Sequence, residues 1–426
     1  MQIIKYPEKN TWSEIVKRPV MDIAALEKSV VGVLKDVKKN GDAALLNYTR
    51  QFDKVKLTDL IVSRKELESA KVPAELETAM KVAYENIFVF HLAQKEQVKI
   101  IETSPGVKCW RKNAAVEKIG LYIPGGSAPL FSTVLMLAIP AKIAGCSEII
   151  LCTPPGKNGK VNEAVLFAAK ICGIRKVFKV GGAQAIAAMA YGTETVQKVN
   201  KIFGPGNRYV TCAKQLIQKE GTAIDMPAGP SELAVLADDS AIPAFVAADL
   251  LSQAEHGPDS QVVLVSDSEN VITEVIKEID AQKNVLPRKE IALTALKNSK
   301  AILVKSMSEG IELLNEYAPE HLIICCKDEE AIADQVINAG SVFLGNYSPE
   351  SAGDYASGTN HTLPTNGHAK AYSGVSLDSF VKKITFQKIS KEGLVKLGNT
   401  IEVMAKAEGL DAHSNAVTIR MRKNIK

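Results

Sequence analysis

Four of the six histidines in this 426-residue chain lie in short segments that also contain carboxylates or amides. These segments are 249–256, 317–321, 351–361 and 408–413. Neutral imidazole ligates metals and transfers protons near neutral pH, and adjacent carboxylates or amides can complete a metal site or an acid–base pair. The alternative is a set of four unrelated surface or helix-capping histidines, and no single segment decides between the two interpretations.

Two of the segments offer paired functional groups. Gln253 and His256 are three residues apart in a helical pattern that begins after Pro243, so both side chains can face one ion. The alternative is that His256 only belongs to the stop signal of that helix. Glu320 and His321 precede an apolar run and can supply two separate bases for a two-step reaction, or they can mark an ordinary junction between a loop and a strand.

A third segment, 351–365, is small, polar and nearly free of large apolar residues. This composition, with Asp354 and His361 inside it, is typical of a binding loop, although a plain surface loop shares it. Glycine turns elsewhere could let backbone approach a nucleotide, but none matches the Gly-x-Gly-x-x-Gly fingerprint. Residues 154–160 end in Gly-Lys, yet the misplaced first glycine and Val161 exclude a P-loop. The residues alone therefore indicate a metal-assisted enzyme with room for a nucleotide.

The elements that must position these residues alternate between strand and helix. Residues 22–100 have apolar residues at helical spacing, interrupted at Gly41, and we expect mostly helix there. Between 116 and 237, short apolar runs end in glycine turns and lead into helical patterns, which is the signature of a parallel sheet. The last fifty residues are predicted to be largely helical.

Two successive sets of strands are predicted, so two similar α/β units lie in tandem. The first set comprises 119–123, 148–152, 177–180 and 201–203. The second comprises 233–236, 261–265, 301–304, 322–326 and 341–344, separated by helical patterns at 243–254, 268–280, 308–316 and 328–338.

Composition excludes several classes of protein. The net charge is only +4 and aromatic residues make up 5% of the chain, which argues against nucleic acid or an anionic membrane as partner. The longest apolar stretch is too short to span a membrane, and the first residues lack the apolar core of a signal peptide. We therefore expect a cytoplasmic protein. The seven cysteines form no Cys-x-x-Cys pair and are expected to be buried free thiols rather than zinc ligands.

Eight motifs in order, covering essentially the whole chain, resemble the histidinol dehydrogenase family. They are Gly120-Leu-Tyr-Ile-Pro-Gly-Gly126, Val180-Gly-Gly-Ala-Gln184, Gly204-Pro-Gly-Asn207, Asp225-Met-Pro-Ala-Gly-Pro-Ser231, Gln253-Ala-Glu-His256, Glu320-His321, Asn360-His361 through Pro364-Thr365, and Glu408 through His413. The resemblance implies two incomplete Rossmann-like domains in tandem, of the aldehyde-dehydrogenase-like kind, with a small N-terminal arm and a helical C-terminal appendage. The implied boundaries are 1–20 for the arm, 21–121 plus 231–375 for the larger α/β domain, 122–230 for the NAD-binding domain, and 376–426 for the appendage.

The resemblance also implies the chemistry. The family oxidises L-histidinol through L-histidinaldehyde to L-histidine with two NAD molecules and one zinc ion per subunit. The matching zinc ligands are Gln253, His256, Asp354 and His413. The matching general base is His321, with an ordinary pKa of about 6.5, and Glu320 matches the group that activates water. Ser231, His361 and Glu408, together with His321 and the four zinc ligands, match substrate-contacting positions. Tyr122, Gln184 and Asn207 match positions that contact NAD.

The resemblance further implies an intertwined homodimer in which Glu408 and His413 complete the partner's site. None of the cysteines is expected to be catalytic. Three rival hypotheses remain: a zinc hydrolase, a non-catalytic metal-dependent binding protein on the same scaffold, and a related dehydrogenase of another alcohol. The first predicts turnover without NAD, the second predicts binding without NADH, and a substrate panel distinguishes the third.

Overall fold

The structure is a computed structural model that describes residues 1–18, 23–125 and 129–422. Gly126, the last residue of one predicted glycine turn, lies outside the described residues. By internal packing the described chain forms two units, Met1–Ala93 with Val116–Phe380, and Gln94–Ala115 with Val381–Lys426. In the described part of the chain, no helix is long and apolar enough to cross a membrane.

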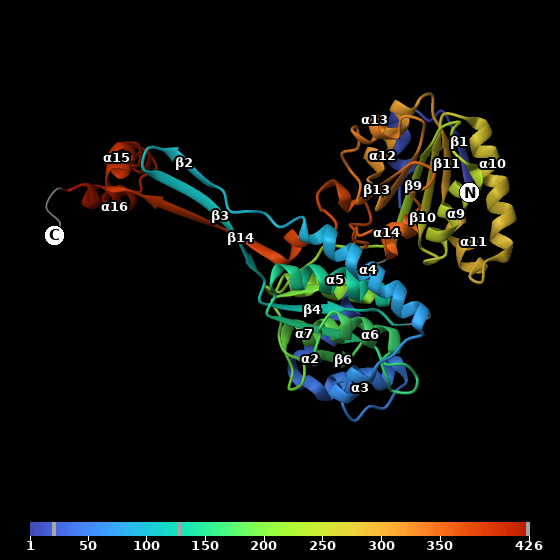
Figure 1. Cartoon of the computed structure of the whole chain (residues 1–426), viewed down its shortest axis with the longest axis horizontal. Coiled ribbons are helices and arrows are strands. Elements are labelled where there is room, and N and C mark those ends of the chain that lie inside the picture. The colour runs from blue at the N-terminus through green and yellow to red at the C-terminus, as the bar shows by residue number, and fades with distance from the viewer. Residues whose placement is uncertain (19–22, 126–128, 423–426) are drawn as a thin grey trace. The chain divides into compact units, whose positions relative to one another are not determined.

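The first unit contains two parallel sheets, as predicted (Figure 1). The five-stranded sheet has the order β6-β5-β4-β7-β8. Its strands are β4 (Lys118–Tyr122), β5 (Glu148–Thr153), β6 (Lys176–Lys179), β7 (Lys201–Phe203) and β8 (Ala223–Ile224). The helices between them are α5 (Phe131–Ala144), α6 (Glu163–Ile171), α7 (Gly182–Tyr191) and α8 (Arg208–Gln218).

The six-stranded sheet has the order β1-β11-β10-β9-β12-β13. Its strands are β1 (Gln2–Lys5), β9 (Glu232–Ala237), β10 (Gln261–Ser266), β11 (Lys300–Leu303), β12 (His321–Cys325) and β13 (Ser341–Leu344). Its longer helices are α9 (Pro243–Ala254), α10 (Glu269–Gln282), α11 (Lys289–Lys297) and α12 (Met307–Tyr317), and its shorter ones are η1 (Lys9–Thr11), α1 (Trp12–Ile15), η3 (Lys283–Val285), α13 (Glu329–Ala333) and α14 (Glu350–Tyr355). Two short helices follow along the chain, η4 (His368–Lys370) and η5 (Leu377–Phe380), and η5 packs in the core of the five-stranded sheet.

Both sheets follow the same chain path. From a central strand, β4 or β9, the chain runs outward on one side and then crosses to the other side. Alternate strand residues face opposite cores: Ile119 packs with α5 and α6, whereas Tyr122 packs with α2 and α7. Helices therefore cover both faces of each sheet, which is the arrangement that continuous apolar strands require. The predicted α/β class with parallel sheets is confirmed.

The N-terminal segments differ from the expected boundaries. The first residues are not a separate arm, because β1 pairs in parallel with β11 and the Trp12 side chain is buried. The helices that follow are α2 (Ile23–Tyr48), η2 (Thr49–Asp53), α3 (Arg64–Ser69) and α4 (Ala74–Leu92). Side chains of α2 and α4 contribute to the two cores of the five-stranded sheet, and α4 also contacts residues 356–360, since Asn86 donates to the Ala356 carbonyl oxygen. The predicted break at Gly41 is a kink at a positive φ of 52°.

The second unit shows that the prediction of a largely helical C-terminal region was incomplete. It contains β2 (Ile100–Ser104), β3 (Val107–Ala115), β14 (Val381–Ile389), α15 (Lys391–Ala407) and α16 (Asp411–Met421). All nine residues of β14 pair antiparallel with β3, far away in sequence. The strand was missed because its pairing partner is not local, whereas the helical spacing of α15 is a local signal.

Candidate active site

The Glu320–His321 pair lies at the amino ends of two neighbouring strands. His321 is the first residue of β12 and stands beside Leu233 of β9. Both side chains of the pair are buried. Ligands of open α/β sheets usually bind at the carboxyl ends of the strands, so this position could not be inferred from the sheet pattern.

The contacts of His321 assign different roles to its two nitrogens. Nδ1 lies 3.2 Å from the main-chain oxygen of Glu232. A carbonyl oxygen only accepts, so this contact places a proton on Nδ1. Nε2 is buried, makes no hydrogen bond with the described residues and lies 3.5 Å from Asp354 Oδ1. In the neutral ring Nε2 is therefore the atom that can accept a proton from a substrate.

Three carboxylates dominate the electrostatics around His321. Burial lowers the pKa of His321, but Glu320, Glu350 and Asp354 oppose burial and raise it to about 10. Burial raises the pKa values of Glu320 and Glu350 to about 8. With these protein groups alone, the pKa of His321 therefore lies above the ordinary histidine value expected from the sequence. A cluster of acids this deeply buried is also a place where a bound cation is strongly favoured.

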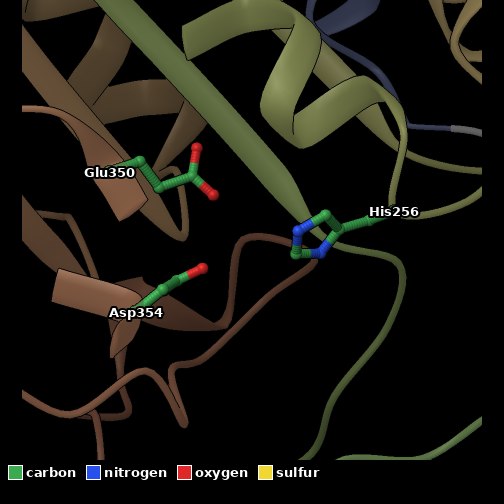
Figure 2. A group of neighbouring side chains, drawn as sticks. All are labelled: His256, Glu350 and Asp354. Atoms are coloured by element: carbon green, nitrogen blue, oxygen red, sulfur yellow. The ribbon is translucent and has the colours of Figure 1, made fainter. Parts of the chain in front are cut away.

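The groups best placed to hold that cation are His256, Glu350 and Asp354, one ligand atom from each lying within 4.8 Å of the others. Figure 2 shows the imidazole and the two carboxylates converging on one space. Glu350 and Asp354 are four residues apart on α14, so they share a helix face. One nitrogen and two oxygen donors fit a zinc ion that keeps positions open for substrate.

Gln253 supports the same cluster from the buried end of α9. With its amide oriented to satisfy both neighbours, its nitrogen donates to Glu350 and its oxygen accepts from the Glu232 N–H at 3.1 Å. Glu350 was missed by the sequence analysis. Its only signal was the four-residue spacing from Asp354, which is too common on helices to indicate a site by itself.

His361 lies against the cluster. Its Nδ1 is 2.9 Å from the Asp354 main-chain oxygen, and its Nε2 is 3.0 Å from Thr133 Oγ1 on α5. Ser231 and His256 line a cavity of about 590 Å³ with Arg18, Asn207 and other residues. His361 therefore lies beside Asp354, Ser231 lines the same cavity as His256, and Thr133, which sequence reasoning did not find, contacts His361.

A second, larger cavity of about 1310 Å³ brings together Tyr122, Gln184 and Asn207. It lies where β4, β5 and β6 end, at the carboxyl edge where such sheets bind nucleotides. The Gly182 N–H donates to Tyr122 Oη at 3.1 Å, and Asn207 Oδ1 caps the first turn of α8. Gly204 adopts a φ of 126°, and a Cβ there would meet the Tyr122 carbonyl oxygen at 2.0 Å. Three glycines of the predicted turns, Gly125, Gly156 and Gly182, thus line one cavity.

The family model described as "Histidinol dehydrogenase" matches residues 16–421. The chain belongs to the histidinol dehydrogenase family. Proteins named histidinol dehydrogenase from Bacteroides fragilis and Bacteroides thetaiotaomicron are 61% and 59% identical over 425 and 423 residues, with 99% of both chains covered in each comparison. The crystal structure of histidinol dehydrogenase from Elizabethkingia anophelis has a TM-score of 0.97 at 55% identity, covering 99% of this chain and 98% of that one.

Family membership confirms the predicted function. Like other histidinol dehydrogenases, this one is an oxidoreductase of the final step of histidine biosynthesis. The zinc hydrolase and the non-catalytic binding protein are thereby set aside. In this chain the structure gathers His256, Asp354 and Gln253. Glu408 and His413 belong to the second unit, where both side chains are exposed.

Proposed function

We propose that this enzyme oxidises L-histidinol to L-histidine in two NAD-dependent steps, with L-histidinaldehyde held between them. The observation that supports this most directly is the buried Glu320–His321 pair, whose Nε2 makes no hydrogen bond with the described residues and faces the His256–Glu350–Asp354 cluster. A proton acceptor aimed at a cation-binding cluster suits a substrate that carries both an oxidisable alcohol and metal-binding nitrogens.

The metal would be one zinc ion per subunit, held by Gln253, His256, Asp354 and the partner subunit's His413. When bound, it supplies a Lewis-acidic template that fixes the imidazole and amine of the substrate. His361 and Ser231 line the surrounding space in this chain. Glu350 lies within reach of the same ion and also accepts from the Gln253 amide, so its carboxylate can orient that ligand.

In the first step, His321 Nε2 accepts the alcohol proton while the carbinol hydride passes to NAD. The aldehyde is then hydrated: Glu320 takes a proton from water as the water oxygen bonds to the carbonyl carbon, and protonated His321 gives its proton to the carbonyl oxygen, which restores the neutral base. In the last step, His321 Nε2 accepts a hydrate proton and the second hydride passes to a second NAD. His321 must be neutral to accept these protons, and its pKa falls when Asp354 shares its charge with a cation.

NAD would occupy the 1310 Å³ cavity, against Tyr122, Gln184 and Asn207. Three features suit a dinucleotide. The glycine turns let the backbone approach closely, Lys157 and Lys160 line the wall, and helix α7 begins at the same edge with its main-chain N–H groups.

We also propose that the enzyme is an intertwined homodimer whose second unit completes the partner's site with Glu408 and His413. The second unit supports this because much of its apolar surface is exposed. Its exposed large apolar residues include Ile100, Ile101, Ile384, Phe386, Val403 and Met404. Apolar side chains gathered on a small unit mark an association surface.

A mixing experiment tests both proposals. His321→Asn and His413→Asn variants should each be nearly inactive. If His413 acts across the dimer, heterodimers of the two variants contain one intact site, and random mixing restores about a quarter of the wild-type activity. If both residues serve the same subunit's site, mixing restores nothing. A chain lacking residues 376–426 that kept full activity would also contradict the dimer proposal.

A further inference from the structure

The main chain of Glu232 contacts both members of the proposed acid–base pair. Its N–H, shared between the Gln253 amide oxygen and Glu320, donates to Glu320 Oε2 at 2.9 Å, and its carbonyl oxygen lies 3.2 Å from His321 Nδ1. The position of this one residue at the start of β9 therefore determines where the Glu320 carboxylate lies. It also determines which nitrogen of His321 carries the proton.

The Glu232 side chain is itself buried, with 3% of its surface exposed. Burial raises its pKa, and the Arg18 guanidinium opposes that effect. Arg18 holds the carboxylate with two bonds, Nε to Oε1 and Nη2 to Oε2, both 2.6 Å long. The Asn366 N–H donates to the same carboxylate. A forked pair of this kind fixes direction as well as charge.

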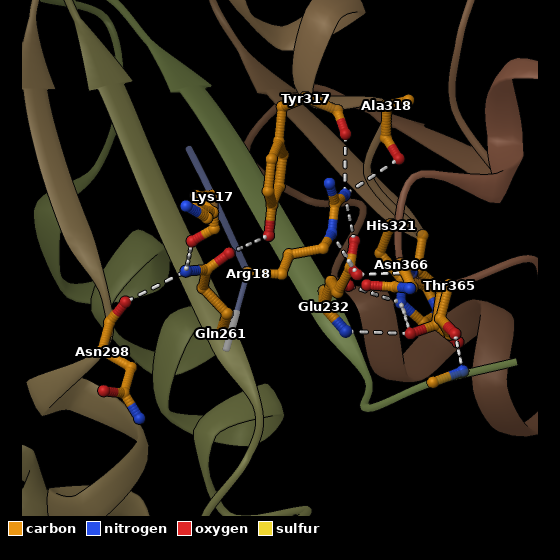
Figure 3. A network of polar contacts seen from close by, with 12 residues as sticks. Lys17, Arg18, Glu232, Gln261, Asn298, Tyr317, Ala318, His321, Thr365 and Asn366 are labelled. Atoms are coloured by element: carbon orange, nitrogen blue, oxygen red, sulfur yellow. Dashed lines mark hydrogen bonds and ion pairs between the residues drawn. The ribbon is translucent and has the colours of Figure 1, made fainter. Parts of the chain in front are cut away.

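Arg18 also holds the segment that leads into Glu320. Its Nη2 donates to the Tyr317 carbonyl oxygen at 2.7 Å, and its guanidinium lies 4.1 Å from the centre of the Tyr317 ring. Ala318 follows in a left-handed conformation with φ of 52°. Figure 3 shows Arg18 between Glu232 and the Tyr317–Ala318 segment. One side chain thus joins the two segments that begin β9 and β12.

We propose that Arg18 is a positioning residue for the Glu320–His321 pair, acting through Glu232 and Tyr317. It touches neither reacting atom of the pair. Without Arg18, the buried Glu232 carboxylate has no cation beside it, and the first residue of β9 is no longer held in position. His321 Nδ1 then loses the carbonyl that holds its proton, so Nε2 is less available as a base. This inference rests on the proposed role of His321.

The test uses zinc-loaded enzyme and the Arg18→Ala and Arg18→Lys variants. For Arg18→Ala we expect kcat to fall on the order of 10–100-fold, as for other groups that orient a site histidine, while the KM values for histidinol and NAD stay near those of the wild type. Arg18→Lys should recover only part of the loss because an ammonium cannot form the fork. Added guanidinium ion should restore kcat of Arg18→Ala in a saturable manner.

The controls separate positioning from folding. Lys17→Ala removes the neighbouring cation, which pairs with exposed Glu14, and should leave kcat unchanged with or without guanidinium. An Arg18→Ala/Glu232→Gln double variant should not respond to guanidinium, because the ion no longer has a carboxylate to bind. In protein labelled with ¹⁵N-histidine, the His321 signals, identified by their loss in His321→Asn, should show the Nδ1 proton in wild type and a mixture in Arg18→Ala.

The outcomes distinguish failure of the Arg18 inference from failure of the proposed function. A wild-type kcat in Arg18→Ala overturns the inference. It is also overturned if kcat falls, guanidinium does not restore it, and the His321 signals are the same as in the wild type. A raised KM for histidinol at unchanged kcat also overturns it, since Arg18 would then bind substrate in the cavity that it lines. If Arg18→Ala fails to fold, the same kinetic and ¹⁵N measurements on Arg18→Lys decide. Activity retained by His321→Asn would instead refute the proposed function.

Discussion

Replacing Lys214 with methionine should both destabilise the enzyme and weaken NAD binding. Lys214 and Asp225 form an ion pair whose side chains are only 4% and 1% exposed. Both members of the pair bind the main chain of Gly204. Lys214 donates to the Gly204 carbonyl oxygen at 2.9 Å, and the Gly204 N–H donates to the Asp225 carboxylate at 2.8 Å. Gly204 leads directly to Asn207, so the ion pair holds the turn that lines the proposed NAD cavity.

The size of the destabilisation follows from the hydrogen bonds that Asp225 keeps when the lysine is removed. Breaking a buried pair by removing one partner costs about 3–5 kcal/mol. Asp225 keeps two main-chain donors, Gly204 and Met226, so we expect the lower end, about 3 kcal/mol. A Lys214→Met/Asp225→Asn double variant removes both charges and should recover at least about 1 kcal/mol relative to the sum of the single changes.

Urea unfolding and calorimetric titration with NAD measure the two effects. The matched control is Lys176→Met, whose lysine pairs with Glu148 at a more exposed site and should change stability by less than about 1 kcal/mol. The reasoning is refuted if Lys214→Met is as stable as the control, or if the double variant shows simple additivity. Unchanged NAD affinity in a destabilised variant would show that the ion pair stabilises the fold without affecting NAD binding in the cavity.

Three further predictions concern single groups. Glu320→Gln should still oxidise the alcohol but yield about one NADH per histidinol, because hydration of the aldehyde loses its base; a yield of two would show that water needs no help from Glu320. Burial raises the pKa of Asp249 from 3.8 to about 7, so its contribution to stability is complete below pH 3.8 and is lost as the pH rises through about 7. In chelator-treated protein, the stability of Asp249→Asn relative to wild type should therefore increase from pH 4 to pH 8, and a difference independent of pH would contradict the assignment. An alanine variant of each of the seven cysteines should keep most activity, and one that is folded but inactive would give that thiol a role.

Local patterns in the sequence account for most of the fold. The strands that end in glycine turns, such as β4 and β7, were predicted within a residue or two because strand, turn and helix signals stand side by side. Strands β1 and β14 were missed for a different reason. Each is stabilised by a partner hundreds of residues away, and nothing in its own few residues reveals that partner.

The candidate site, like the fold, was predicted from the sequence only in part. Motif resemblance placed Glu320, His321 and Asp354 in one site, and the structure brings these three together. It could not indicate Glu350 or the Arg18–Glu232 pair, because both depend on contacts between distant segments. Nor could it indicate that three carboxylates raise the pKa of His321, since that shift depends on burial and distance rather than on residue type.

The central claim is that one site performs both oxidations with a metal in place. The most direct measurement is the amount of NADH formed per histidinol consumed, with excess NAD, with and without a chelator. The account predicts two NADH per histidinol and none after chelation. One NADH in the wild-type enzyme, or undiminished turnover after complete removal of the metal, would contradict it.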